Sequence, residues 1–89
     1  MTMIYYKHYA ESVLGEGTAF MAVDTEEDQV VRQVETYGDK FFWSDAESQS
    51  DERFMLADQP ASEIGLGEEH QIEQSEFEEV WAKAGGACR

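Results

Sequence analysis

Short runs of β-branched and aromatic residues, separated by glycines and acidic residues, fill the first half of the chain. Runs of this composition are typical of β-strands, because branched and aromatic side chains pack well on a pleated surface. The pattern predicts four strands, over Met3–Tyr9, Thr18–Val23, Gln29–Tyr37 and Phe41–Trp43. The connections between them are short, so we expect a largely antiparallel sheet.

Turn residues separate these strands. We expect turns at Gly15–Gly17, at the acidic run Asp24–Asp28 and at Gly38–Asp39, the last of which would close a hairpin. The third strand does not alternate cleanly, because Val30 and Arg32 would share one of its faces. This irregularity indicates a β-bulge within that strand.

The composition changes after the fourth strand. Small polar and acidic residues fill Ser44–Asp51, which predicts a mobile loop because such residues bury little apolar surface. Beyond the loop, Arg53–Leu56 is compatible with a short edge strand or a helical turn, and Ser62–Gly65 with a further brief turn.

The last element is an amphipathic helix, expected over Glu73–Ala84. Its apolar residues recur at i, i+3, i+4 and i+7 and form one stripe. They are Phe77, Val80, Trp81 and Ala84. Two helix starts are open: Glu73 as the N-cap with Ile72 packed against Phe77, or a capping box made by Ser75 and Glu78.

These elements predict one small domain. A chain of 89 residues, 42% of them apolar, can bury one core but not two. We expect an α+β fold over residues 1–84, with the helix packed on one face of an antiparallel sheet of about four strands. Residues 85–89 would form a flexible tail.

The charge balance restricts the partners that the protein can have. Six basic against twenty acidic residues give a formal net charge of -14, which disfavours direct binding to nucleic acid or to anionic lipid. No apolar run reaches the roughly 18 residues of a membrane span. The first residues also lack the basic and apolar regions of a secretory signal, so we expect a cytoplasmic protein.

Few residues offer catalytic or metal-binding chemistry. His8 and His70 are the only histidines and lie far apart in the sequence, and Cys88 is the single cysteine. They do not supply the closely spaced pairs that zinc sites need. No serine lies in a nucleophile elbow, and acidic residues flank the glycine clusters that could otherwise hold a phosphate. We therefore expect no enzyme activity, metal or cofactor.

Two stretches carry a resemblance. Val30–Glu35 reads V-V-R-Q-V-E and precedes an aromatic residue and a glycine, and Ile72–Ala84 contains F-E-E-V-W. Both are similar to a family of small uncharacterised bacterial proteins, a domain of unknown function, with an E-V-R-K-V-E strand and an I-x-x-x-E-F-E-x-V-W helix. The resemblance implies a helix packed on a sheet and no enzyme activity. Within it, Arg32 and Glu35 would form an internal ion pair or an exposed recognition site.

The many carboxylates have two interpretations. They can serve only as a solvating surface, or they can attract a basic partner, because a surface of one sign selects the opposite charge. We expect an inhibitor that docks on a basic nuclease, toxin or nucleic-acid-binding protein, as toxin-immunity and phage anti-defence proteins do. The candidate contact residues are Glu26, Glu27, Asp28, Arg32, Glu35, Trp43, Asp45 and Glu47.

Two alternatives stay open. The aromatic residues of the sheet could bind a small ligand or support an enzyme site near Trp43. The domain could also associate with itself as a structural module or homodimer.

Overall fold

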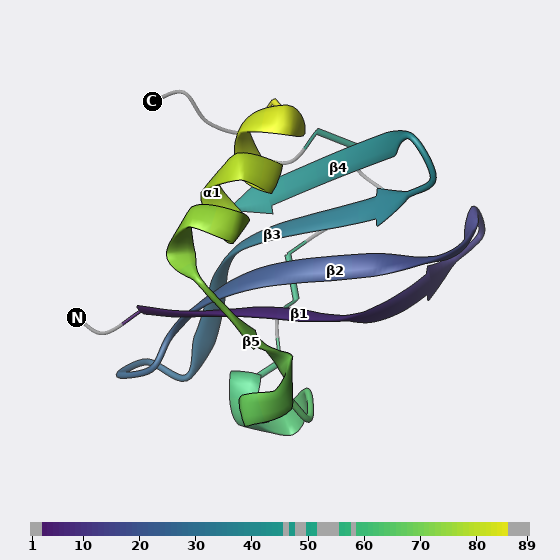
Figure 1. The fold of residues 1–89 in the computed structure, drawn as a ribbon. Helices are drawn as coiled ribbons and strands as arrows, with labels where there is room; N and C mark the ends of the chain where they lie inside the picture. Colours follow the sequence, from purple (N-terminus) through teal and green to yellow (C-terminus); the bar gives the residue numbers. More distant parts are fainter. Residues whose placement is uncertain (1–2, 46, 48–49, 52–55, 58, 86–89) are drawn as a thin grey trace.

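The chain forms an α+β domain in which a five-stranded antiparallel sheet carries one α-helix (Figure 1). The computed structural model describes residues 3–45, 47, 50–51, 56–57 and 59–85. The sheet order is β4-β3-β2-β1-β5. The main elements are β1 (Met3–Ser12), β2 (Gly15–Asp24), β3 (Gln29–Tyr37), β4 (Lys40–Asp45), β5 (Gln71–Ile72) and α1 (Gln74–Lys83).

The predicted α+β fold and antiparallel sheet are confirmed, with one strand more than expected. The additional strand, β5, has two residues, which pair with Tyr5 and Tyr6 of β1. A strand this short has no hydrophobic periodicity of its own, so the sequence pattern could not indicate it.

The first turn lies earlier in the chain than predicted. Val13 and Leu14 form it, and Ser12 pairs with Gly15 across the hairpin. Gly15 has a φ of 101°, a conformation that residues with side chains rarely adopt. The glycine cluster therefore begins β2 and does not form the turn. The turns in the acidic run and at Gly38–Asp39 are confirmed.

The irregular third strand contains the predicted bulge. Ala22 of β2 pairs with Arg32, but the next residue, Val23, pairs with Val30, so that Val31 is the extra residue of β3. The bulge places Val30 and Arg32 on opposite faces of the sheet. Val30 joins the core on one face, whereas Arg32 lies over the ring of Phe77 on the other.

One face of the sheet is covered by α1 (Figure 1). The core on this side contains Tyr5, Phe20, Ala22, Val34, Phe77 and Trp81. Phe77 is fully buried and stacks on Trp81 with ring centroids 6.0 Å apart, and Trp43 meets Trp81 edge-on at 5.6 Å. The predicted packing of the helix on one sheet face is thus confirmed.

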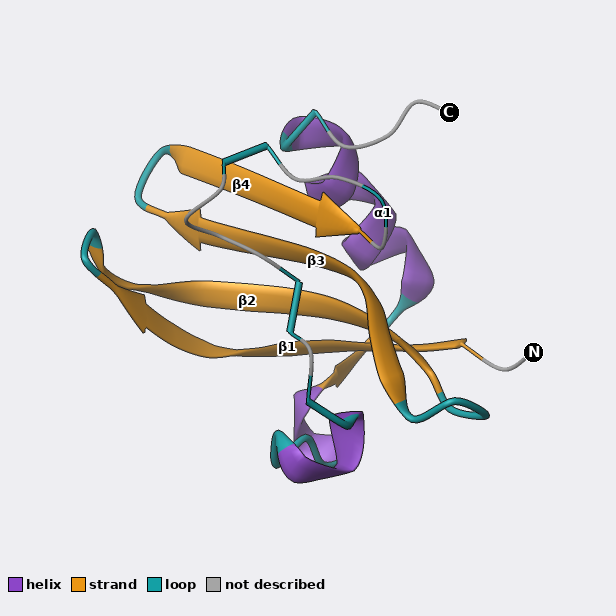
Figure 2. Ribbon diagram, turned by 180° about the vertical axis from the view of Figure 1, so that it is seen from behind, coloured by secondary structure: helices purple, strands orange, loops and turns teal. Residues whose placement is uncertain are grey.

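The opposite face is covered by an irregular segment, the strap, which comprises residues 56–57 and 59–70 (Figure 2). The strap contains two short 3-10 helices, η1 (Ala61–Glu63) and η2 (Glu68–His70). The brief turn predicted at Ser62–Gly65 corresponds to η1 and the turn after it. The core beneath the strap is built from small and medium side chains. It contains Ala19, Met21, Val23, Val30 and Ala61.

The loop predicted at Ser44–Asp51 begins later than expected. Ser44 and Asp45 belong to β4, and Ser50 returns to that strand because its N–H donates to the Trp43 carbonyl over 2.9 Å. Residues 46 and 48–49 lie outside the described residues, as do residues 53–55 of the predicted edge strand or helical turn. Residues 86–89 of the predicted tail also lie outside them.

The first of the two predicted helix starts is correct. Glu73 occupies the N-cap position, with no hydrogen bond from its side chain to the helix. Ile72 packs against the core that contains Phe77, as expected for a hydrophobic contact across the helix start. The alternative capping box of Ser75 and Glu78 is wrong, because Ser75 already lies inside the helix.

Candidate functional site

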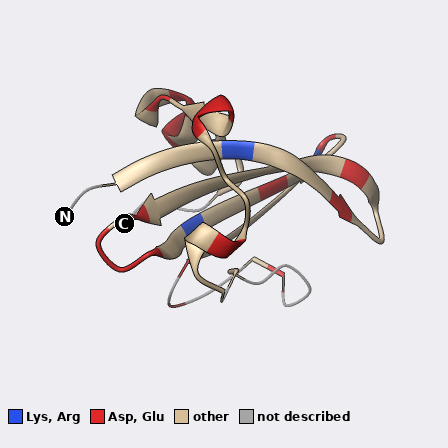
Figure 3. Ribbon diagram, turned by 90° about the horizontal axis from the view of Figure 1, so that it is seen from below, with Lys and Arg blue, Asp and Glu red and all other residues tan. Residues whose placement is uncertain are grey.

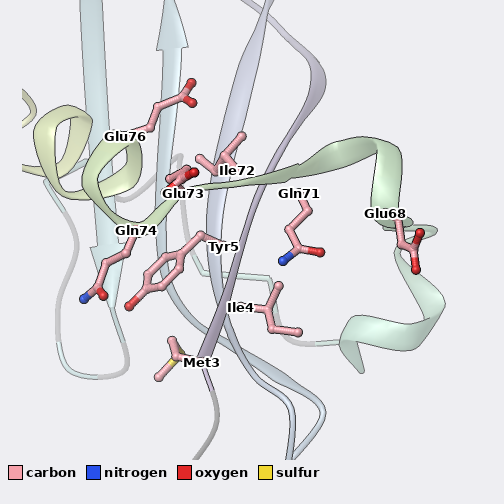
Figure 4. A pocket seen from close by; sticks show the side chains of 9 residues that line it. All are labelled: Met3, Ile4, Tyr5, Glu68, Gln71, Ile72, Glu73, Gln74 and Glu76. Carbon is pink, nitrogen blue, oxygen red and sulfur yellow. The ribbon is translucent and has the colours of Figure 1, made fainter.

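An open cleft of about 780 Å³ lies where β5 pairs with β1 and leads into α1 (Figure 4). Its walls come from the start of β1, from η2 and β5, and from the first turn of α1. The described residues that line it are Met3, Ile4, Tyr5, Glu68, Gln71, Ile72, Glu73, Gln74 and Glu76.

The cleft exists because β5 brings a distant part of the chain to the edge of β1. Ile72 lies opposite Tyr5 in the sheet, and Glu73 continues in an extended conformation before α1 begins. Tyr5 is buried, and its ring lies 5.3 Å from the ring of Phe77. One side of the cleft therefore rests directly on the core beneath the helix.

The rim of the cleft is negatively charged. Glu68, Glu73 and Glu76 are its charged side chains, and no basic residue is present among the described lining residues. Lys7 Nζ forms an ion pair with Glu76 Oε2 at 3.2 Å from outside the cleft. Within the described part of the chain, Glu68 and Glu73 form no ion pair. The cleft therefore combines apolar side chains with a surplus of negative charge, which suits a cationic group attached to an apolar stem.

Arg32 and Glu35, which the sequence singled out together, lie on opposite faces of the sheet. Arg32 lies beneath α1, where both of its terminal nitrogens donate to the Glu78 carboxylate, over 3.0 and 2.8 Å. Its guanidinium also lies 4.9 Å from the centre of the Phe77 ring. Hydrogen bonds to Arg32 hold the pKa of Glu78 below its ordinary value, and the bonds to Glu78 raise the pKa of Arg32. The internal ion pair thus exists, but its acidic partner is Glu78.

Glu35 belongs to a hydrogen-bond network on the strap side. The Tyr37 hydroxyl donates to Glu35 Oε1 over 2.5 Å, and Gln33 Nε2 donates to Oε2 over 3.0 Å. Burial, followed by the bond to Glu35, raises the pKa of Tyr37 to about 12. These bonds give Glu35 a structural role in fixing the end of β3.

The acidic turn divides into exposed and structural residues. Glu26 and Glu27 are exposed, and their N–H groups donate to the side chain of Asp24. The Asp28 carboxylate accepts bonds from the N–H and the hydroxyl of Ser62, over 2.9 and 2.7 Å. Asp28 therefore fastens the strap to the sheet, whereas Glu26 and Glu27 are exposed in the turn.

The remaining predicted contact residues, Trp43, Asp45 and Glu47, also differ in their exposure. Trp43 packs against Trp81 beneath the helix, so it is not an exposed aromatic anchor. Asp45 lies opposite Arg32 at the end of β4 and accepts a bond from the N–H of Glu47, which is exposed. The eight predicted residues consequently do not form one surface, although acidic residues occur over much of the molecule (Figure 3).

The sequence did not indicate that Glu68, Glu73 and Glu76 line one cleft, although all three are plainly acidic. The sequence contains many similar glutamates, and the pairing of β5 with β1 is what gathers these three around one cleft. No local signal distinguishes them from the others.

The two histidines are close in space, contrary to what their sequence separation suggests. The rings of His8 and His70 lie 4.6 Å apart between centroids. His8 Nδ1 lies 2.8 Å from the Tyr9 carbonyl, and His70 Nδ1 accepts a bond from the N–H of Gly67 over 3.1 Å. Within the described residues, no group of three or more His, Cys, Asp or Glu side chains is placed to hold a metal ion. The histidine pair therefore fits a contact between β1 and η2.

Comparisons with family models, curated proteins and solved structures found no match to this chain. Among the described residues, none of the helices has the length and apolar character needed to cross a bilayer.

Proposed function

We propose that this protein is a non-enzymatic binding protein that docks on a basic protein partner and inhibits it. The cleft at the β1–β5 edge carries the proposal, because Glu68, Glu73 and Glu76 border a partly apolar surface and its described lining contains no basic residue. The partner would be a nuclease, a toxin or a nucleic-acid-binding protein, as for toxin-immunity and phage anti-defence proteins.

The geometry of the cleft suits an arginine or lysine side chain. The aliphatic stem of such a residue can lie against Met3 and Ile72 while its charged end meets a carboxylate. Bonds between a guanidinium and a carboxylate are among the strongest in protein interfaces, since both partners are charged. The net charge of -14 would further accelerate the encounter with a basic surface.

Inhibition follows from the type of partner. A protein that acts on nucleic acid gathers its cations in the groove that holds the phosphates. An acidic domain bound to that groove would exclude the nucleic acid by occupying the same cations. The bound domain would need no chemistry of its own.

The alternative of a ligand site on the aromatic sheet face has less support. Trp43 packs against Trp81, and Tyr37 is buried. The alternative of self-association is opposed by the repulsion between two copies that each carry a charge of -14.

The proposal is tested by titrating basic probe proteins, protamine and core histones, against two variants of equal charge. One variant, E68Q/E73Q/E76Q, neutralises the cleft. The matched control, E26Q/E27Q/E47Q, neutralises three exposed glutamates at other positions that the sequence suggested. We expect wild-type binding to weaken steeply with salt, and the cleft variant to bind at least about tenfold more weakly than the control.

Two results would contradict the proposal. An equal loss of affinity in both variants would mean that binding depends on net charge and not on the cleft. Binding that does not respond to salt would mean that electrostatic attraction does not drive docking. Serum albumin, an acidic probe, provides the negative control for all three proteins.

A further inference from the structure

The hairpin between β1 and β2 projects beyond the rest of the sheet (Figure 1). The last pair between β2 and β3 joins Thr18 to Thr36, whereas β1 and β2 continue to pair as far as Ser12 and Gly15. β5 pairs with β1 only at Tyr5 and Tyr6. Beyond Thr18 and Tyr6, the described part of this hairpin therefore pairs with no further strand, although Tyr37 at the end of β3 lies against Gly17.

The tip of the hairpin is apolar and exposed. Val13 is 85% exposed and Leu14 37%, and Tyr9 on the adjoining part of β1 is 57% exposed. Tight turns favour Gly, Asn, Asp, Pro and Ser, each for a conformational or hydrogen-bonding reason. Val13 and Leu14 offer none of these advantages, and placing them in water contributes nothing to folding. Their position calls for an explanation outside the fold.

Local contacts hold the hairpin both at its turn and at its base. The N–H of Leu14 donates to Ser12 Oγ over 3.0 Å within the turn. The ring of Tyr37 lies against Gly17, where an added Cβ would come 2.5 Å from a ring carbon. Tyr37 is itself buried and bonded to Glu35. The tip is therefore preorganised, which lowers the entropy lost when it binds.

Carboxylates flank the apolar tip. Glu11 and Glu16 are directly opposite each other in the hairpin, and both are exposed. Like charges at directly opposed positions destabilise a sheet, and a cation placed between them would remove that repulsion. The Tyr9 hydroxyl lies 3.5 Å from Glu16 Oε1, at the limit of hydrogen bonding. The tip thus presents apolar side chains bordered by negative charge.

The geometry points to this tip as the apolar anchor of the docking surface, a role that rests on the function proposed above. Val13 and Leu14 would enter an apolar recess on the basic partner, and a lysine or arginine beside that recess would lie between Glu11 and Glu16. The cleft and the tip lie near opposite ends of β1, about 23 Å apart for the seven residue-to-residue steps from Tyr5 to Ser12. One partner lying along β1 can reach both.

A second copy of the chain is a poor occupant of this surface. It would bring an identical pair of carboxylates toward Glu11 and Glu16, so repulsion would oppose the apolar contact. Charge complementarity therefore favours the basic partner.

The experiment uses a display library of random linear and cyclised peptides, selected against the wild-type protein. The test variant is V13S/L14S, and the matched control is V13I/L14M, which keeps both side chains apolar. A third variant, E11Q/E16Q, removes the flanking charges. V13S/L14S and V13I/L14M should keep the wild-type melting temperature, because the substituted side chains are exposed. E11Q/E16Q should keep or raise it, because it removes the repulsion between two opposed carboxylates.

We expect enriched peptides to combine a large apolar residue with lysine or arginine. They should bind V13S/L14S at least about tenfold more weakly than wild type and should bind V13I/L14M nearly as well. E11Q/E16Q should bind more weakly and lose the preference for cations.

Three results would overturn the inference. The first is equal affinity of the peptides for V13S/L14S and wild type. The second is enrichment of peptides without cations, or no enrichment at all, and the third is a wild-type dimer that V13S/L14S abolishes.

A protamine titration of E68Q/E73Q/E76Q and V13S/L14S separates the two proposals. If only the cleft variant loses binding, the tip has no role and the proposed function stands. If only the tip variant loses binding, the cleft is the wrong site.

Discussion

The two faces of the sheet are covered in physically different ways. Beneath α1, large aromatic side chains make the contact, with Phe77 fully buried and Trp81 between Phe77 and Trp43. Beneath the strap, the core residues are smaller, and hydrogen bonds fix the covering segment. Those bonds include the pair from Ser62 to Asp28 and the bond from the Ala57 N–H to Gln33 Oε1.

A short acidic chain can thus cover the two faces of its sheet by two different physical means. The buried aromatic rings supply area on the helix side, and area is what hydrophobic stabilisation scales with. The strap has little regular structure and few large side chains, so its position depends on polar anchors. We therefore expect the helix side to determine global stability and the strap side to determine local order.

The strongest test of this comparison is Trp81→Ala. Trp81 is 5% exposed and contacts rings from both α1 and β4, so truncation should leave a cavity and cost about 3–5 kcal/mol in the free energy of unfolding. Chemical denaturation measures the loss. Glu79→Ala, on the exposed side of α1, is the control and should change little. A melting temperature equal to that of wild type would show that the helix contributes little to the core.

The strap is tested by Asp28→Ala. This change removes both bonds to Ser62 and should cost about 2 kcal/mol, less than the loss at Trp81. Hydrogen exchange should accelerate at the N–H groups of Ala61 and Ser62, both of which bond to Asp28.

A second substitution at Asp28 distinguishes the effect of the lost hydrogen bonds from that of backbone strain. Asp28 has a φ of 55°, where alanine is strained and glycine is not. Asp28→Gly removes the carboxylate without the strain, so exchange should accelerate as in Asp28→Ala while the stability loss is smaller. Unchanged exchange in both variants would show that the Asp28 carboxylate does not hold the strap.

The same contrast explains which parts of the fold the sequence could predict. The helix was predictable because its apolar stripe repeats with the helical period, and the bulge because Val30 and Arg32 break the alternation of β3. The strap has no period, and β5 is too short to show one. The turn at Val13–Leu14 was misplaced because glycines usually mark turns, whereas here Gly15 follows the turn.

The candidate site was harder to predict than the fold, because its residues come together only in the tertiary structure. Glu68 and Glu76 are separated by β5, and only the pairing of that strand with β1 places both beside Met3 and Ile4. The sequence singled out Arg32 together with Glu35, but its partner Glu78 lies 46 positions away in the sequence. Local patterns cannot identify contacts at such separations.

The smallest effect expected is that of Glu78→Gln, which tests whether the helix side also depends on a polar anchor. Glu78 is partly exposed, so solvent screens its pair with Arg32 and the loss at neutral pH should be about 1 kcal/mol. The pKa of Glu78 is lowered in the folded protein, mainly by the hydrogen bonds from Arg32. Its contribution is therefore present above the ordinary carboxyl pKa and is lost as the pH falls through the lowered folded value.

The measurement is denaturant unfolding of wild type and Glu78→Gln at neutral pH and through the acid range. Their stabilities should converge as the pH falls through that range, because wild-type Glu78 then also becomes neutral. The control Glu79→Gln removes a charge from a more exposed ion pair with Lys83 and should cost less at every pH. A constant difference between wild type and Glu78→Gln at all pH values would assign the loss to packing. A loss as large as that of Trp81→Ala would mean that the ion pair, and not the aromatic area, holds the helix on the sheet.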